Sequence, residues 1–480
     1  MRGLTQRLAA GLAAALWAGS VQAQTADSAE AWRLLARADL DAAHALILDS
    51  HPGAAPELGD AAFQQRMRRG YETARDRIPA IDGYTGYTAI LAGFATSFGD
   101  EHIWSSQRLR GVPYTWAGRV MTRRGGHWVV AAQDGDDKGL VGARLASCDG
   151  ETAEALAGSR LAFRVSAPVE AQYIAHGGFM FVDDGNPFLT RPRTCVFGTE
   201  GGPVSVDLEW RAVDTPRLAE ALTAAMAGGR AGFGVRRSGD HWWIAMESLS
   251  DAAATVAADV EARAGEWRDS PALVIDLRGN GGGDSRHARR LADAIYGAEY
   301  TAARLRGGSA CAALWRASPG NAAHARDFAA RAQDPQTARY YSALADDIDR
   351  AVAEGRAFDE PVPDCAPAEP VATPTPAPAY QGRVVILTDH ACFSSCLLMV
   401  RDFRRLGALH VGEATNAATR YMEVREIVLP SGLTKFSTLQ KVVIGEDADI
   451  GPFAPEHLFP GSMNATAALE GWIAGLLSQG

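Results

Sequence analysis

Residues 384–400 read VVILTDHACFSSCLLMV, and the rest of the chain is best interpreted from this stretch. The apolar run 384–387 is typical of a buried strand, and the apolar spacing after Cys396 is typical of a helix. The hydroxyl pair Ser394 and Ser395 therefore lies where a strand turns into a helix. A serine at such a point lies beside free backbone N–H groups and the positive end of the helix dipole.

Two interpretations of this serine pair are open. Ser394 and Ser395 can simply cap the helix, because a serine oxygen commonly accepts a hydrogen bond from a first-turn N–H group. Alternatively, one of them is a nucleophile, since this position is suited to stabilising an alkoxide or an oxyanion. The remaining sequence has to decide between them.

A second turn of the same kind follows a strand-like run, where residues 272–283 read ALVIDLRGNGGG. The glycines can cradle a phosphate, bind a dinucleotide, present backbone N–H groups to an oxyanion, or form a tight turn without a ligand. No Lys-Ser or Lys-Thr pair follows, as a phosphate loop requires, and the spacing does not fit a dinucleotide turn. Neighbouring strands of a parallel sheet end at the same edge, so we expect the two turns to meet across one cleft.

The composition is that of a globular protein, with 480 residues of which 47% are apolar and 22% charged. A formal net charge of −10 argues against nucleic acid or an anionic membrane as the main partner. The cysteines and histidines lack the close spacing of a zinc site, so we expect no metal and no other cofactor.

The N-terminus has the pattern of an export signal. Arg2 and Arg7 precede an apolar run, and Val21-Gln22-Ala23 follows as a small-x-small cleavage pattern. We therefore expect residues 1–23 to be a signal peptide. No later stretch is long enough to span a bilayer, so the mature protein is expected to be periplasmic or secreted, without an integral membrane segment.

Six cysteines follow in the mature part of the chain. An oxidising compartment favours disulfides, although the sequence alone leaves the pairing open. Pairing between sequence neighbours would give Cys148–Cys195, Cys311–Cys365 and Cys392–Cys396. The last pair flanks the two serines, so a bridge there would staple their turn.

The remaining pattern divides the mature chain into three regions. Residues 24–110 have helical apolar spacing, and residues 111–213 alternate strand-like runs with Gly and Asp turns, as in a small β-rich module. Residues 214–480 alternate strands with helices, as in an α/β layer. A largely helical insertion with a Pro-rich end interrupts that layer at 300–380.

The two turns resemble motifs of the S41 family of serine peptidases, which includes the carboxyl-terminal processing and tricorn-like peptidases. The glycine motif at 272–283 and the segment 384–415, which closes with G-E-A-T, carry the resemblance. Weaker similarities are the G-D-E-H run at 99–102 and the stretch 450–456. The resemblance implies a crotonase/ClpP-like α/β core and places 111–213 where the family often carries a PDZ-like module.

The resemblance also implies roles for individual residues. Ser394 is placed as the nucleophile, with the backbone N–H of Ser395 and that of Gly281 or Gly282 as the oxyanion hole. Two features depart from the processing peptidases. Leu397 stands where they carry glutamate, and residues 416–420 lack the lysine that they use as a base.

The tricorn-like branch instead uses a histidine as base, which is His102 here. Imidazole is suited to general-base catalysis near neutral pH. The acid of the family precedes the stretch 450–456, so Asp449 or Glu446 is the candidate for the third catalytic residue. The rival histidines are His51, His287 and His410.

These features lead us to expect an exported serine-type endopeptidase that acts on a peptide or protein substrate through Ser394, His102 and Asp449. The departures from the processing peptidases motivate an alternative, a non-catalytic S41-like protein that binds peptides or small ligands in the same cleft. Hydrolysis of a non-peptide ester is a third possibility.

Overall fold

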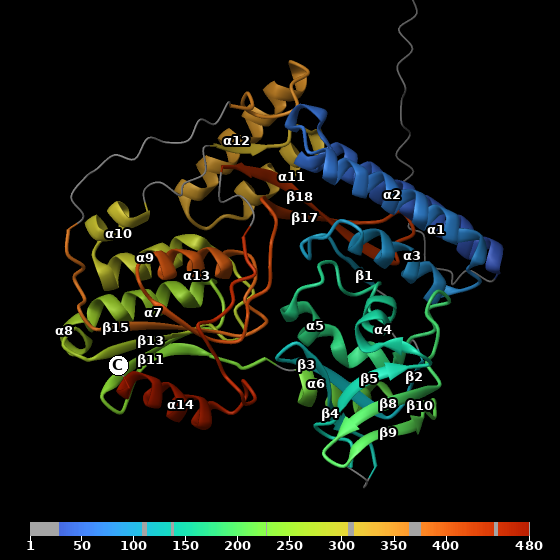
Figure 1. The fold of residues 1–480 in the computed structure, drawn as a ribbon. Helices are drawn as coiled ribbons and strands as arrows, with labels where there is room; N and C mark the ends of the chain where they lie inside the picture. Colours follow the sequence, from blue (N-terminus) through green and yellow to red (C-terminus); the bar gives the residue numbers. More distant parts are fainter. Residues whose placement is uncertain are drawn as a thin grey trace, which may run out of the picture.

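The computed structural model describes residues 28–107, 113–135, 139–226, 228–305, 312–363, 376–445 and 450–479 (Figure 1). The expected signal peptide and the expected Cys311–Cys365 bridge lie outside the described residues. No helix within these ranges combines the length and the apolar character that crossing a membrane requires.

A six-stranded sheet forms the centre of the C-terminal half. Its strands lie in the order β11 (Phe233–Ser238), β12 (His241–Met246), β13 (Ala272–Asp276), β15 (Arg383–Thr388), β16 (Leu409–Gly412) and β19 (His457–Leu458). All neighbouring strands are parallel except β11 and β12. Every residue of β12 and β13 is buried, which explains why these strands read as largely apolar runs.

Helices cover both faces of this sheet, as Figure 1 shows. α7 (Asp251–Ala262), α9 (Ser285–Tyr296) and α13 (Ser395–Arg405) pack on one face, and α14 (Thr466–Ser478) packs on the other. The short helices α8 (Ala264–Trp267) and α10 (Ala298–Leu305) adjoin α7 and α9. This layered arrangement confirms the expected α/β fold class.

Three helices form the expected N-terminal helical region: α1 (Ala29–Ser50), α2 (Ala61–Arg77) and α3 (Tyr84–Thr96). The 3-10 turns η1 (Pro52–Ala54), η2 (Pro56–Leu58) and η3 (Ile78–Ala80) connect them. Ser28 and Asp60 are the N-cap residues of α1 and α2, because their side chains accept hydrogen bonds from first-turn N–H groups.

The N-terminal helices share one hydrophobic core with a second sheet. In that sheet β18 (Thr434–Ile444) pairs with β17 (Tyr421–Val428), β1 (Ser105–Gln107) and β14 (Ala312–Trp315). Strands from three distant parts of the chain therefore tie the N-terminal helices to the C-terminal half.

The β-rich region contains an antiparallel sheet of β3 (Arg119–Arg124), β4 (His127–Gln133), β5 (Arg144–Cys148), β8 (Thr194–Thr199) and β9 (Gly202–Asp207), with β6 (Glu151–Thr152) beside β5. A smaller sheet joins β10 (Arg211–Val213), β2 (Tyr114–Trp116) and β7 (Val182–Asp183). The helical elements are α4 (Ala153–Arg160), α5 (Glu170–His176), η4 (Gly177–Phe181) and α6 (Thr215–Met226). The disulfide Cys148–Cys195 joins β5 to β8 and confirms that expected pairing. The PDZ-like character of this region stays a prediction.

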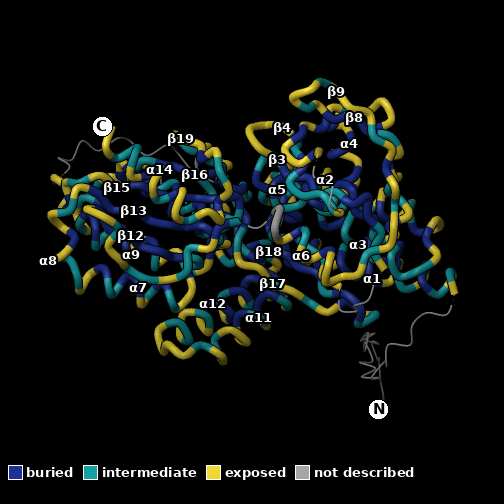
Figure 2. Tube along the Cα trace, turned by 90° about the horizontal axis from the view of Figure 1, so that it is seen from below, coloured by how far each residue is buried: buried dark blue, intermediate teal, exposed yellow. Residues whose placement is uncertain are grey.

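The insertion contributes β14, α11 (Pro319–Arg331) and α12 (Pro335–Ala353), and is thus largely helical as expected. The pairing of β14 with β18 attaches it to the second sheet. In Figure 2, α11 and α12 lie at the surface, whereas the strands β12, β13 and β15 are buried. The insertion is therefore added around the α/β core and is not part of its interior.

Candidate active site

Ser394 occupies the turn between β15 and α13. It directly precedes the helix, yet its side chain makes no capping hydrogen bond. Its backbone has φ 56° and ψ −126°, a conformation that is rare for a residue with a side chain. The capping interpretation therefore fails for Ser394. Backbone strain of this kind is concentrated at functional sites.

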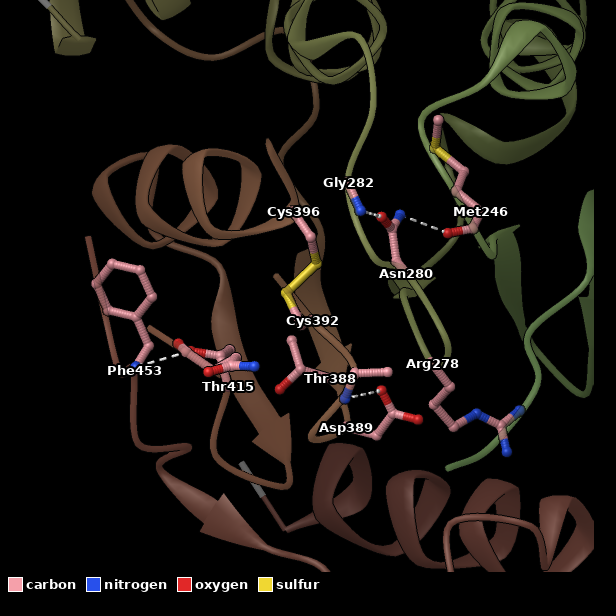
Figure 3. The surroundings of a disulfide bond; sticks show 12 residues. Met246, Arg278, Asn280, Gly282, Thr388, Asp389, Cys392, Cys396, Thr415 and Phe453 are labelled. Carbon is pink, nitrogen blue, oxygen red and sulfur yellow. Dashed lines mark hydrogen bonds between the residues drawn. A yellow bond between two sulfur atoms is a disulfide. The ribbon is translucent and has the colours of Figure 1, made fainter. Parts of the chain in front are cut away.

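A disulfide between Cys392 and Cys396 spans the same turn and confirms the expected pairing (Figure 3). Both side chains are buried, and their Cα atoms lie 5.4 Å apart. The backbone N–H of Leu397 donates to the Ser394 carbonyl, so the helix begins immediately after the serine. The bridge fastens the two ends of the strained turn.

The glycine turn lies directly against the serine turn. A Cβ atom added to Gly282 would lie 2.8 Å from the Cβ of Ser394 and 2.9 Å from the backbone nitrogen of Ser395. Gly282 also has φ +102°, which disfavours any side chain. The backbone N–H of Phe393 donates to the carbonyl of Asn280 at 3.2 Å. The two turns therefore meet, as the sequence predicts.

Some backbone N–H groups of the two turns already donate a hydrogen bond, whereas others are available to a ligand. That of Gly282 donates to the Asn280 side chain at 2.9 Å, and Asn280 in turn donates to the carbonyl of Met246 at 2.8 Å (Figure 3). The N–H groups of Gly281 and Ser395 have no acceptor among the described residues. Of the two glycines considered, the hydrogen bonding thus favours Gly281 as an oxyanion donor.

His102 lies in the loop between α3 and β1 and is held by a carboxylate. Its Nδ1 atom lies 2.8 Å from Oδ1 of Asp100, and its backbone N–H donates to the same oxygen at 2.9 Å. The Thr419 hydroxyl donates to the other oxygen of Asp100. A carboxylate at Nδ1 favours the tautomer in which Nε2 is free to accept a proton.

Asp100 is the residue that sequence reasoning missed. It is buried, with 3% of its surface exposed. Burial alone would raise the pKa of Asp100, but the hydrogen bonds and charge of His102 and the bond from Thr419 lower it below its ordinary value. Asp100 lies two residues before His102 in the G-D-E-H run, and an acidic residue so close to the candidate base is the signal that could have identified it.

Ser394 and His102 line one cavity of about 710 Å³. The His102 ring also packs on the Phe393 ring, with centroids 4.2 Å apart. The Ser437 hydroxyl of β18 donates to the His102 carbonyl at 2.8 Å, which fixes the loop to the second sheet. Among the described residues, no hydrogen bond joins Ser394 to His102. The structure thus places the two predicted residues in the lining of one cavity.

The three rival histidines lie outside this cavity. Nδ1 of His51 accepts the N–H of Gly53 at 3.0 Å, and burial lowers the pKa of His51 to about 3. His410 is buried in β16, where burial lowers its pKa to about 4. His287 lies in the first turn of α9. Asp449 and Glu446, the candidates for the third catalytic residue, lie outside the described residues.

A buried carboxylate supports the glycine turn from the side of β15. Both oxygens of Asp389 accept the N–H of Gly279, each at 3.1 Å. Burial raises the pKa of Asp389 to about 6, although His390 and the bond from Gly279 act in the opposite direction. Within the described ranges, no group of three or more His, Cys, Asp or Glu side chains is arranged to hold a metal ion.

An α/β layer, a strained serine at a helix start and an opposing glycine turn together define a hydrolase-like site. Residues 243–450, which contain both turns, match peptidase family S41. The match covers somewhat less than half of the 480-residue chain and supports serine peptidase as its general class. The resemblance seen in the sequence is thereby confirmed.

Solved structures of low sequence identity share the fold. Mature CPAF is similar with 14% identity and a TM-score of 0.57, over 93% of this chain and 98% of that chain. Mature CPAF complexed with lactacystin is similar with 14% identity and a TM-score of 0.56, over 94% of this chain and 100% of that chain. No curated protein sequence matches the chain. The shared fold extends well beyond residues 243–450.

Proposed function

We propose that this protein is an exported serine endopeptidase in which the Ser394 hydroxyl attacks the carbonyl carbon of a peptide bond. His102 accepts the Ser394 proton at Nε2 and delivers it to the leaving amine as the C–N bond breaks. Water then hydrolyses the acyl ester on Ser394, again with His102 as base. One observation carries the proposal: Ser394 and His102 line one cavity, and a buried carboxylate holds the His102 ring.

The tetrahedral intermediate requires hydrogen-bond donors for its negative oxygen. We assign the backbone N–H groups of Gly281 and Ser395, because neither has another acceptor among the described residues. The N-terminus of α13 adds positive charge at the same point. Gly282 has a different role, since its missing side chain lets the two turns approach each other.

Asp100 is assigned as the residue that positions His102. Its carboxylate contacts Nδ1 of the ring and stabilises the imidazolium that forms during proton transfer. Asp449 and Glu446 keep the role that the S41 resemblance implies for one of them, as predictions.

Labelling with a fluorophosphonate probe tests the mechanism directly. Ser394→Ala and His102→Ala should abolish labelling and lower kcat/KM by roughly 10⁴-fold or more. Ser205→Ala is the matched control, since Ser205 is an exposed serine of β9 in the β-rich region. Full activity in both the Ser394 and the His102 variants would refute the mechanism.

Export is supported by the disulfides Cys148–Cys195 and Cys392–Cys396, because disulfides persist in oxidising compartments. N-terminal sequencing of the protein recovered from the periplasm or medium should read from Gln24. A mature chain that still begins at Met1 would contradict export by this signal.

Non-catalytic peptide binding is the second candidate, and the absence of a hydrogen bond between the described Ser394 and His102 favours it. Catalytic hydrogen bonds often tighten only when substrate binds, so peptidase activity is still the preferred function. Incubation with a mixed peptide library and with simple esters separates the candidates. Cleaved peptides indicate a peptidase, cleaved esters alone an esterase, and bound but intact peptides a binding protein.

A further inference from the structure

The helical insertion forms one wall of the cavity that contains Ser394. Trp315 at the end of β14, Phe328 of α11, and Tyr340 and Tyr341 of α12 line this cavity together with Ser394 and His102. We call these four residues the aromatic wall. The peptidase motifs lie in other elements, so the wall is a feature that the insertion adds to the site.

The rings of the aromatic wall form one connected cluster. The ring of Tyr341 lies 4.4 Å from that of Phe328, 5.1 Å from that of Tyr340 and 6.4 Å from that of Trp315, measured between centroids. Burial raises the pKa of Tyr341 to about 12, so its hydroxyl stays neutral at physiological pH. The wall is therefore an uncharged aromatic surface.

Two members of the wall keep much of their surface open to solvent. Phe328 is 42% exposed and Tyr340 is 53% exposed. Aromatic rings gain most from burial against other apolar groups. A ligand side chain that covers these rings would therefore remove apolar surface of both partners from water.

The rest of the cavity is compatible with an apolar side chain. Leu398 of α13, Met422 of β17 and Ile450 also line it. The charged groups in the lining are partly compensated, because Arg286 pairs with Asp284 at 2.7 Å and the Lys441 amine lies over the Trp315 ring at 5.5 Å. The Glu423 carboxylate also lies in the lining. The lining thus combines an extended apolar surface with charges of both signs, of which Arg286 and Asp284 form an ion pair.

We propose that the aromatic wall is a substrate subsite that selects a large apolar residue, aromatic or long aliphatic, close to the scissile bond. The inference rests on the proposed peptidase function, since it assigns the subsite to the cavity of Ser394. A phenylalanine or leucine side chain at that position contacts Phe328 and Tyr340, whereas glycine or serine leaves both rings in water.

Paired peptides test the subsite. The two members are identical except for phenylalanine or glycine at one residue beside the cleaved bond. Wild-type protein should cleave the phenylalanine peptide with a higher kcat/KM than the glycine peptide, and the ratio of these two values measures the selectivity. The double variant Phe328→Ala/Tyr340→Ala should reduce that ratio roughly tenfold, because loss of the two aromatic contacts weakens binding of the phenylalanine side chain by about this factor. Phe233→Ala is the matched control, since Phe233 is a 45% exposed phenylalanine of β11 outside the cavity.

A binding measurement separates failure of the subsite from failure of the peptidase function. Fluorescence anisotropy records the affinity of both labelled peptides for Ser394→Ala protein, with and without the double substitution. Tighter binding of the phenylalanine peptide, lost in the triple variant, supports the subsite even if no peptide is cleaved. Cleavage with a ratio that the double variant leaves unchanged overturns the subsite and leaves the peptidase function intact. Equal affinity of both peptides for the Ser394→Ala protein also overturns it.

Discussion

Gly282 and Ser394 lie so close together that no side chain fits between them. A methyl group on Gly282 would meet the Ser394 Cβ at 2.8 Å, where ordinary van der Waals contact begins at 3.4 Å. The glycine turn and the serine turn are thus fitted to each other, and the position of each depends on the other.

Gly282→Ala should therefore displace the serine turn. The added methyl group clashes with backbone and side-chain atoms, and φ +102° opposes any side chain. We expect kcat/KM to fall by roughly 100-fold, the effect of an ångström-scale misplacement, with a loss of about 1–3 kcal/mol in the free energy of unfolding. Gly265→Ala in α8 is the control, because nothing lies within 4 Å of its Cβ position and it does not line the cavity. Equal effects of the two substitutions would show that the contact is unimportant.

Asp100→Asn should leave the fold intact and slow the reaction. The amide keeps the size of the carboxylate but loses the charge that favours the Nδ1–H tautomer of His102. We expect kcat to fall by roughly 10²- to 10⁴-fold, measured in parallel with the melting temperature. Glu101→Gln is the neighbouring control, since Glu101 contacts His176 and Asn416 instead of His102. An unchanged kcat for Asp100→Asn would assign the acid to another residue, with Asp449 and Glu446 next to be tested.

The bridge Cys392–Cys396 should matter more for activity than for stability. It closes a loop of sequence separation 4, whereas Cys148–Cys195 closes one of 47. In the chain-entropy account these bridges contribute about 2 and about 4 kcal/mol to the free energy of unfolding. Replacing Cys392 and Cys396 by alanine should slow fluorophosphonate labelling at least about tenfold through misplacement of Ser394.

The Cys148→Ala/Cys195→Ala protein provides the comparison for that prediction. It should lose more stability in urea unfolding, yet label at the normal rate below its melting temperature. The opposite ranking would mean that the bridge beside Ser394 is merely a general stabiliser.

Asp389 should make stability depend on pH. Its pKa is raised from 3.8 to about 6 in the folded protein, so between these values the folded state binds more protons than the unfolded state. The contribution is fully present below pH 3.8 and is lost as the pH rises to about 6. The loss is at most about 1.4 kcal/mol for each pH unit of this window.

Urea unfolding at pH 4, 5, 6 and 7 measures this effect, with Asp389→Asn as the reference. The difference in unfolding free energy between wild type and variant should change across the window and level off above it. A constant difference at all four values would show that Asp389 titrates normally.

The sequence predicts those strands whose residues are apolar because they are buried. Residues 272–277 and 384–387 are apolar because both faces of their strands are covered, and this pattern predicts the strands and the turns that follow them. Pairing between neighbouring cysteines is one of several possibilities that the sequence allows, and the bridges 148–195 and 392–396 agree with it. The family motifs also predict Ser394 and His102 as site residues, and both line one cavity.

Other features depend on side-chain geometry that no local pattern encodes. The bond from Gly282 to Asn280 depends on how the amide is turned, and the contact of Asp100 with His102 depends on a loop held by Thr419 and Ser437 of the C-terminal half. The aromatic wall depends on the pairing of β14 with β18, a contact between distant segments. Long-range packing therefore sets the parts of the site that sequence reasoning left open.

The second sheet also has a consequence for how the protein is made. His102 is held by Ser437, and Ser394 comes from the last quarter of the chain, so the site needs both ends of the polypeptide. A nascent or partly exported chain that ends before β18 contains the nucleophile turn but lacks the strand that positions the base. Under the proposed mechanism, the protein therefore stays inactive until synthesis and folding are almost complete, and this delay requires no separate inhibitor.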